Sequence, residues 1–139
     1  MKELTNILLF LIPKANVEFV LEDYTIRQVM EKMDFHHYTA IPVLTRDGKY
    51  LETISDSDLL KTIKDNKLNW EKSMEIKIKD VDLIRNIKPI KVDKNIFELI
   101  DLIENQNFVP VIDDMEHFIG IITRKSVIEY MTRKIDFTK

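Results

Sequence analysis

Apolar residues recur at helical spacing in two stretches of the chain. After Thr25 and again after Asn95 they stand three and four positions apart, which places them on one face of a helix. Gln28 and Glu98 follow these two residues by three positions, a spacing typical of a capping box at the start of a helix. The segments "TIRQVMEKM" and "NIFELIDLI" are therefore predicted to form two helices that begin alike.

Two short apolar runs follow each predicted helix, with a polar turn, "TRDG" or "DDMEH", between them. Such runs are typical of paired strands. A short strand before each helix, in "VEFVL" and "PIKV", and a closing helix after the hairpin complete a β-α-β-β-α half. The predicted hairpin strands are residues 40–44 with 49–54 and residues 109–112 with 118–122, and the predicted closing helices are residues 56–65 and 125–134.

The two halves are copies of one another. Pro42 and Pro110 lie 68 positions apart, and this offset holds without a gap through the next strand and helix. The upstream helices align at an offset of 70, which leaves two extra residues in the first half, within "DFHHY". We predict a first repeat at residues 7–66, a polar linker at residues 67–79 and a second repeat at residues 80–135.

A half of about 60 residues buries too little apolar surface to be very stable alone. We therefore expect an α/β (α+β) fold in which the two repeats pack sheet to sheet about a pseudo-twofold axis and form two related clefts. The segment from Leu4 to Ile12 is expected to form a short helix on this domain or on a partner chain, and packing on the domain is favoured. Its apolar run is much shorter than the roughly 20 residues of a membrane span, and it lacks the flanks of a signal peptide.

The composition narrows the classes of function. Apolar residues make up 45% and charged residues 32% of the chain, which is typical of a globular protein. The formal net charge of −3 argues against nucleic-acid binding through bulk charge. The chain has no cysteine, which excludes disulfides and thiolate metal sites and agrees with a reducing cytoplasm. We expect a cytoplasmic protein without a nucleic-acid or membrane partner.

The segments "YTAIPVLTRDGKYLETISDSDLL" and "FVPVIDDMEHFIGIITRKSVI" share an order of residue types. A small or hydroxyl residue precedes a hydrophobic-proline pair, and glycine, two hydrophobic residues, Ser or Thr, two variable positions and Asp come later. This order resembles a tandem pair of cystathionine-β-synthase (CBS) domains, the Bateman module, over residues 11–131. The resemblance implies a stand-alone regulatory protein that binds an adenine nucleotide (AMP, ADP, ATP or cyclic di-AMP) as a regulatory ligand, with no required cofactor.

Ser55 and Asp58 allow two interpretations. Their spacing is that of a capping box, in which the serine hydroxyl accepts from a backbone N–H. The CBS resemblance implies that Asp58 also accepts hydrogen bonds from ribose hydroxyls, with Ser55 beside the phosphate, and that Asp58→Ala weakens binding and leaves the fold intact. It implies as ligand-binding residues Thr39, Ala40, Ile41, Pro42, Ser55 and Asp58 in the first copy, and Val109, Pro110, Thr123, Arg124, Lys125 and Ser126 in the second.

Both copies depart from the family pattern. Ser126 stands at the position of Asp58, and a hydroxyl is not a charged acceptor. Glu52 stands at the position of Gly120, where the family has glycine so that backbone comes close. We therefore expect one good site at Asp58 and a second that is weaker, altered or empty.

Candidate chemistry outside this motif is sparse. His36 and His37 are adjacent, with no third ligand at metal spacing, and His117 has no partner identifiable from the sequence. No nucleophile, base and orienting acid stand together, so we expect neither an enzyme nor a metal site. The resemblance implies a homodimer that passes its signal to an unknown separate protein. The rival interpretation is a protein–protein interaction module with an empty cleft, and a small nucleotide hydrolase ranks third.

Overall fold

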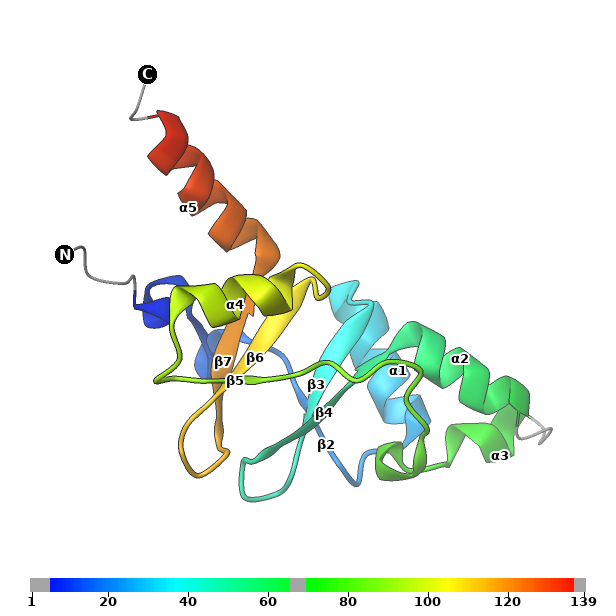
Figure 1. The fold of residues 1–139 in the computed structure, drawn as a ribbon. Coiled ribbons are helices and arrows are strands. Elements are labelled where there is room, and N and C mark those ends of the chain that lie inside the picture. Colours follow the sequence, from blue (N-terminus) through cyan, green and yellow to red (C-terminus); the bar gives the residue numbers. More distant parts are fainter. Residues whose placement is uncertain (1–5, 66–69, 137–139) are drawn as a thin grey trace. The chain divides into compact units, whose positions relative to one another are not determined.

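The computed structural model describes residues 6–65 and 70–136. These residues form two compact units, whose elements are labelled in Figure 1. The β2–β4 unit holds residues 18–86, and the β5–β7 unit holds residues 6–17 together with residues from 87 onward. Each unit has its own sheet and its own apolar core, so each is described by itself.

The β2–β4 unit has a three-stranded sheet in the order β2-β3-β4. β2 runs parallel to β3, and β3 runs antiparallel to β4 with Ala40 opposite Ser55. The register shifts between Val43 and Leu44. The elements of this unit are β2 (Val20–Leu21), α1 (Ile26–His36), β3 (Ala40–Leu44), β4 (Tyr50–Ser55), α2 (Asp56–Asp65), α3 (Trp70–Met74) and the 3₁₀ helix η3 (Ile78–Asp80).

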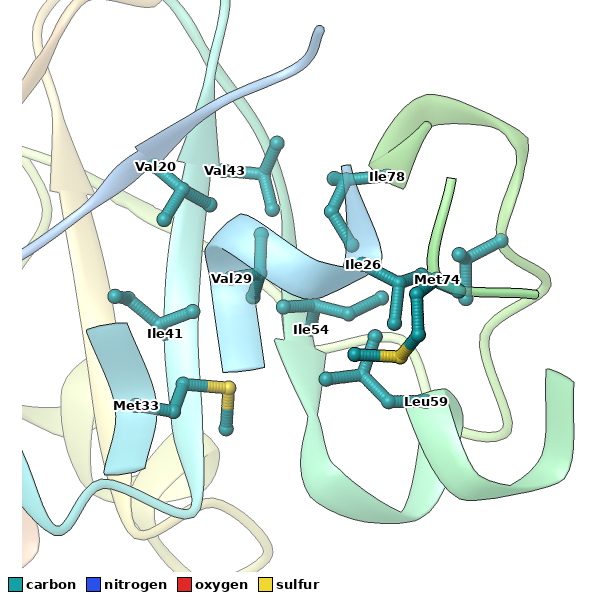
Figure 2. Packing of buried hydrophobic residues seen from close by; sticks show 11 residues of the cluster. Val20, Ile26, Val29, Met33, Ile41, Val43, Ile54, Leu59, Met74 and Ile78 are labelled. Carbon is teal, nitrogen blue, oxygen red and sulfur yellow. The ribbon is translucent and has the colours of Figure 1, made fainter. Parts of the chain in front are cut away.

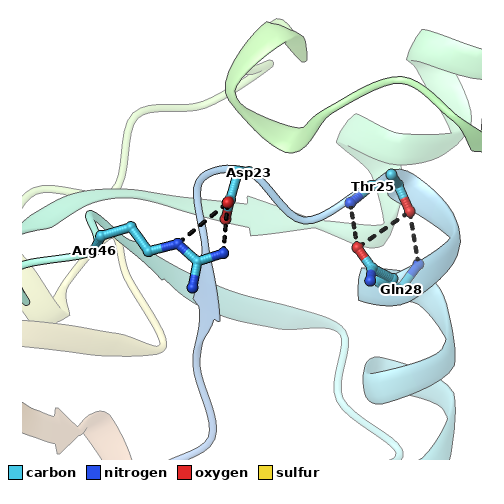
Figure 3. A network of polar contacts seen from close by, with 4 residues as sticks. All are labelled: Asp23, Thr25, Gln28 and Arg46. Carbon is cyan, nitrogen blue, oxygen red and sulfur yellow. Dashed lines mark hydrogen bonds and ion pairs between the residues drawn. The ribbon is translucent and has the colours of Figure 1, made fainter.

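α1 begins where the sequence predicts and extends to His36. Thr25 and Gln28 form the reciprocal capping box, with the Thr25 N–H donating to Gln28 Oε1 at 2.8 Å (Figure 3). His37 ends the helix with φ of 59°, the left-handed conformation in which glycine is common. Beside the cap, Arg46 donates to Asp23 and lowers the pKa of that carboxyl, which ties the β3–β4 turn to the start of the helix (Figure 3).

The core of the β2–β4 unit includes side chains from beyond α2. Met74 and Ile78 are buried among residues of α1, the sheet and α2 (Figure 2). Apolar burial of this kind contributes about 1.5–3 kcal/mol per side chain. The buried residues of this cluster are Val20, Ile26, Val29, Met33, Ile41, Val43, Ile54, Leu59, Met74, Ile78 and Val81.

The β5–β7 unit repeats this plan with one more strand. Its sheet has the order β1-β7-β6-β5, and β1 lies antiparallel to β7 with Ile12 opposite Ile121. Asn95 and Glu98 form the second reciprocal capping box. The elements are η1 (Ile7–Phe10), β1 (Ile12–Pro13), η2 (Lys14–Asn16), β5 (Ile90–Lys91), α4 (Ile96–Ile103), β6 (Phe108–Ile112), β7 (Phe118–Thr123) and α5 (Arg124–Asp136).

Each core is completed by a segment from outside its own predicted repeat. Ile7, the first residue of the predicted first repeat, is fully buried in the core of the β5–β7 unit. Ile78, ahead of the second repeat's strands, is fully buried in the core of the β2–β4 unit. Backbone bridges join Asn6 to Asn95 and Lys77 to Thr25, so each segment lies against a helix start. The sequence analysis missed this exchange.

The fold class is confirmed, since the chain has two sheets and helices on the plan of two β-α-β-β-α repeats. The expected helix from Leu4 to Ile12 is wrong in part: the helix is a 3₁₀ turn, Ile7–Phe10, and Ile12 belongs to β1. Leu4 lies outside the described residues. The exact repeat boundaries and the packing of one sheet against the other stay predictions.

Gly120 allows β1 to approach β7. Its φ is +154°, and a Cβ built on it would lie 2.1 Å from the Ile12 carbonyl oxygen. A side chain at this position would therefore push β1 away from the edge of the sheet. Gly48 has φ of 92° in the β3–β4 turn, where no atom stands close to the added Cβ.

We expect Gly120→Ala to lower the free energy of unfolding by about 1–3 kcal/mol more than Gly48→Ala, because only the first adds a backbone clash to the unfavourable φ. Urea denaturation of both variants, followed by circular dichroism, measures the difference. Equal losses in the two variants would contradict the close approach of β1.

Candidate ligand site

Ser55 and Asp58 form the junction between β4 and α2. The Asp58 N–H donates to Ser55 Oγ at 3.1 Å, and the Ser55 N–H donates to Asp58 Oδ2 at 2.8 Å. The Ser55 hydroxyl donates to the same carboxylate oxygen at 2.9 Å. These reciprocal bonds satisfy backbone donors at a helix start, so the capping-box interpretation is confirmed.

The second oxygen of Asp58 holds the segment that follows η3. Oδ1 accepts from the Ile84 N–H at 2.7 Å, and the Asp58 side chain is buried, with the residue 2% exposed. A carboxylate offers about four acceptor positions, and the described residues supply donors to three of them. Asp58 is therefore a structural residue first, and it has room for about one further donor.

Glu52 lies on β4 near this carboxylate. It stands opposite Val43 in the β3–β4 register and is half-buried. Burial, and after it the negative charge of Asp58, raises the pKa of Glu52 to about 6. Among the described residues, none donates a hydrogen bond to the Glu52 side chain. No local donor therefore stabilises its negative charge.

The matching junction of the second copy is built from neutral groups. Thr123 Oγ1 and Ser126 Oγ lie 2.8 Å apart, and the Ser126 N–H donates to Thr123 Oγ1 at 3.1 Å. The capping geometry is therefore kept with a hydroxyl in place of the carboxylate. Arg124 donates through Nε to the Ile103 carbonyl oxygen at 2.7 Å, which anchors α5 to the end of α4. Lys125 is exposed.

The backbone at the two junctions is equivalent. The Asp56 N–H donates to the Thr39 carbonyl oxygen at 2.9 Å, and the Arg124 N–H donates to the Asn107 carbonyl oxygen at 2.8 Å. Of the residues expected to meet an adenine, Thr39 is exposed and Ala40 half-buried. The remaining members of the predicted set, Ile41, Pro42, Val109 and Pro110, have buried side chains.

Pockets within the units include only some of the predicted residues. Ser126 lines a pocket of about 540 Å³ between η1 and α5, with Phe10 and Tyr130 in its wall and Arg133 and Lys134 beside them. The Phe10 and Tyr130 rings meet edge to face at 5.2 Å between centroids. Sequence analysis did not select these aromatic residues, because their rings come together only when η1 packs on α5.

Two more hollows lie beside the helix starts. Arg124 and Lys125 line a hollow of about 410 Å³ on the β5–β7 unit. On the β2–β4 unit a groove of about 420 Å³ runs past Asp56 and Ser57 to the exposed Leu60 and Trp70. Ser55 and Asp58 do not line this groove.

His36 and His117 each lie beside a carboxylate. His36 Nε2 lies 3.5 Å from a Glu18 oxygen, and His117 Nδ1 lies 3.5 Å from an Asp113 oxygen, a pairing that the sequence analysis did not identify. Within residues 6–65 and 70–136, no three His, Asp or Glu side chains are grouped as metal ligands. Among those same residues no helix has the length and apolar character needed to span a bilayer.

Comparison with known proteins identifies the class. The sequence pattern described as "CBS domain" matches residues 11–65 and again residues 78–133. Together these matches cover most of the chain, and the chain belongs to the CBS-domain family. The resemblance seen in the sequence is therefore confirmed.

Particular relatives share both sequence and fold. The chain is 29% identical to CbpB in a crystal structure with cyclic di-AMP, with a TM-score of 0.87 over 97% of this chain and 90% of that one. It is 30% identical to CbpB from Streptococcus agalactiae, with a TM-score of 0.82 over 93% and 82% of the two chains. It is 29% identical to protein MJ1426 of Methanocaldococcus jannaschii over 79% of this chain and 83% of that protein.

The three bonds to the Asp58 carboxylate change the expectation for Asp58→Ala. We expect the substitution to lower the free energy of unfolding by about 2–4 kcal/mol, because the partly buried N–H groups of Ser55 and Ile84 lose a charged acceptor. Ser126→Ala, the matched change in the second copy, removes only neutral bonds and should cost about 0.5–1.5 kcal/mol. Thermal and urea unfolding of both variants measure the costs, and equal losses would contradict the structural role of Asp58.

The raised pKa of Glu52 predicts a pH-dependent stability. Between pH 4.5 and about 6 the folded chain binds a proton at Glu52 more tightly than the unfolded chain, so the stability of the wild type falls as pH rises through this window. The Glu52→Gln variant has no titrating group at this position. Its free energy of unfolding relative to that of the wild type should therefore rise through the window by about 1 kcal/mol, a value reduced for partial exposure. Unfolding experiments at pH 4 and pH 8 test this, and the same difference at both values would contradict it.

Proposed function

We propose that the protein is a regulatory module that binds an adenine nucleotide and is not a catalyst. The observation that carries the proposal is the likeness to CbpB with cyclic di-AMP over 97% of the chain at 29% identity. The ligand is a regulatory one, and it transmits its presence as a change of conformation or of dimer state. A ligand achieves this only through a difference in its affinity for the two states.

The Asp58 junction supplies the recognition of the sugar. The carboxylate is fixed by its bonds to Ser55 and Ile84, so it is preorganised and loses little freedom when a ligand binds. Its remaining capacity of about one hydrogen bond suits one ribose hydroxyl. The ribose of AMP or ATP carries two free hydroxyls, whereas each ribose of cyclic di-AMP carries one. This difference favours cyclic di-AMP as the ligand at this junction.

The second copy contributes a weaker site. Thr123 and Ser126 offer hydroxyls and no carboxylate, and the exposed Lys125 lies one residue away as a cation for phosphate. Arg124 uses its Nε for the bond to Ile103, and its guanidinium has further N–H groups that can donate. The Thr39, Ala40, Ile41 and Pro42 strand start, and the Val109 and Pro110 strand, provide backbone for the adenine in this proposal.

The output is a protein–protein event. We propose a cytoplasmic homodimer whose arrangement depends on the nucleotide and which acts on a separate protein partner. The exposed apolar side chains around the groove of the β2–β4 unit, Tyr38, Leu60 and Trp70, supply a surface for such contacts.

A second function has its own support. The same groove and the buried state of Asp58 favour a protein–protein interaction module that binds no nucleotide. The two functions differ in one property, because only a nucleotide sensor is stabilised by nucleotide in the absence of any partner.

Isothermal titration calorimetry with cyclic di-AMP, AMP and ATP tests the proposal. We expect cyclic di-AMP to bind more tightly than AMP, and Asp58→Ala to weaken binding about ten- to a hundredfold, since a hydrogen bond to a charged group contributes about 1.5–3 kcal/mol. Asp56→Ala, an exposed carboxylate in the same helical turn, serves as the control.

Asp58→Ala is also expected to cost stability, so its folding is verified at the titration temperature and Asp58→Asn is measured beside it. Loss of affinity in a folded Asp58 variant, with Asp56→Ala unchanged, supports the site. Undetectable binding of all three nucleotides, or unchanged affinity in Asp58→Ala, contradicts it.

A further inference from the structure

The two copies differ most where one has Gly120 and the other Glu52. In the β5–β7 unit, Gly120 lies under β1, and the Ile12 carbonyl oxygen occupies the space that a Cβ would need. Glu52 holds the corresponding place on β4, at the same offset as the proline pair. A residue with a Cβ at this place excludes the close approach that β1 makes in the other copy.

The corresponding segment of the β2–β4 unit takes another path. Its sheet ends at β4, without a fourth strand among the described residues. The Ile84 N–H donates to the Asp58 carboxylate at 2.7 Å. Glu52 therefore lies on the edge strand of this sheet, where it is half-buried.

Glu52 adds a negative charge to a site that is proposed to bind an anion. Glu52 lies on β4 three residues before Ser55, whose N–H and hydroxyl donate to Asp58 Oδ2. Burial, and after it the charge of Asp58, raises the pKa of Glu52 to about 6. At neutral pH Glu52 is therefore mostly ionised. A nucleotide that brings phosphates to the Ser55 helix start would meet this charge at short range, whereas the second copy has glycine at this place.

We propose that the charge of Glu52 lowers the affinity of the Asp58 site for phosphate-bearing ligands, and thereby sets how far the first copy is occupied. This inference rests on the proposed function. Glu52 acts as a specificity residue: it disfavours ligands with more negative charge, such as ATP, relative to cyclic di-AMP.

The groups that face Glu52 come from few elements. α2 supplies Asp58, β3 supplies the apolar Val43, and β4 itself supplies Tyr50, whose pKa is raised chiefly by burial. Of these, Asp58 is the one other carboxylate. A change of ligand affinity between pH 5 and pH 8 that disappears in a Glu52 variant is therefore assigned to Glu52.

The experiment compares wild type with Glu52→Gln by calorimetry at pH 5 and pH 8, using cyclic di-AMP and ATP. Glu31→Gln, which removes the same charge from an exposed position on α1, is the matched control. Cyclic di-AMP has phosphodiesters that do not titrate in this range, and affinities are compared as the ratio of variant to wild type at each pH. We expect Glu52→Gln to raise the affinity for cyclic di-AMP about three- to tenfold at pH 8 and less than about twofold at pH 5.

The gain should be larger for ATP than for cyclic di-AMP, and Glu31→Gln should match wild type. Equal affinities of wild type and Glu52→Gln at both pH values overturn this inference and leave the proposed function standing. A gain of the same size at pH 5 and pH 8 also overturns it, since shape and not charge would then be responsible. Absence of nucleotide binding by every protein at both pH values overturns the proposed function and this inference together.

Discussion

Each core depends on a segment from outside its own predicted repeat. Ile7 from the first repeat and Ile78 from the linker are fully buried in these cores, and a repeat of about 60 residues has little apolar surface to spare without them. The exchange also brings backbone against the junction of sheet and closing helix. In the β2–β4 unit it presents the Ile84 N–H to Asp58, so the same carboxylate caps α2 and fixes the exchanged segment.

The two copies share one backbone plan at the junction of strand and closing helix but place different side chains on it. In both copies a hydroxyl at the last strand residue, Ser55 or Thr123, caps the start of the closing helix, α2 or α5. In both, the N–H of the next residue donates an equivalent backbone hydrogen bond. Asp58 then adds a fixed negative charge where Ser126 adds a neutral hydroxyl. Glu52 and Gly120 extend the difference, since one places a carboxylate on the edge strand β4 and the other admits β1 as a fourth strand. The two copies therefore carry different charges on the same local plan.

Much of this fold follows from local pattern. The capping boxes at Thr25 and Asn95, and the closing helix that begins at Asp56, lie where residue spacing predicts them because nearby residues determine these features. The exchange of Ile7 and Ile78, and the η3 turn in the expected linker, depend on contacts between residues distant in sequence, which periodicity does not report. For the same reason Asp58 could be chosen from its spacing, whereas its bond to Ile84 could not.

The central claim is that an adenine nucleotide binds at the Asp58 junction. A titration of isotope-labelled protein with cyclic di-AMP, followed by the backbone amide signals in NMR, tests it most directly. The account predicts saturable shifts at the amides of Ser55, Asp58 and Ile84, whose N–H groups bond to or flank the carboxylate. Binding that leaves these three amides unmoved, or no shift anywhere in the chain, would contradict it.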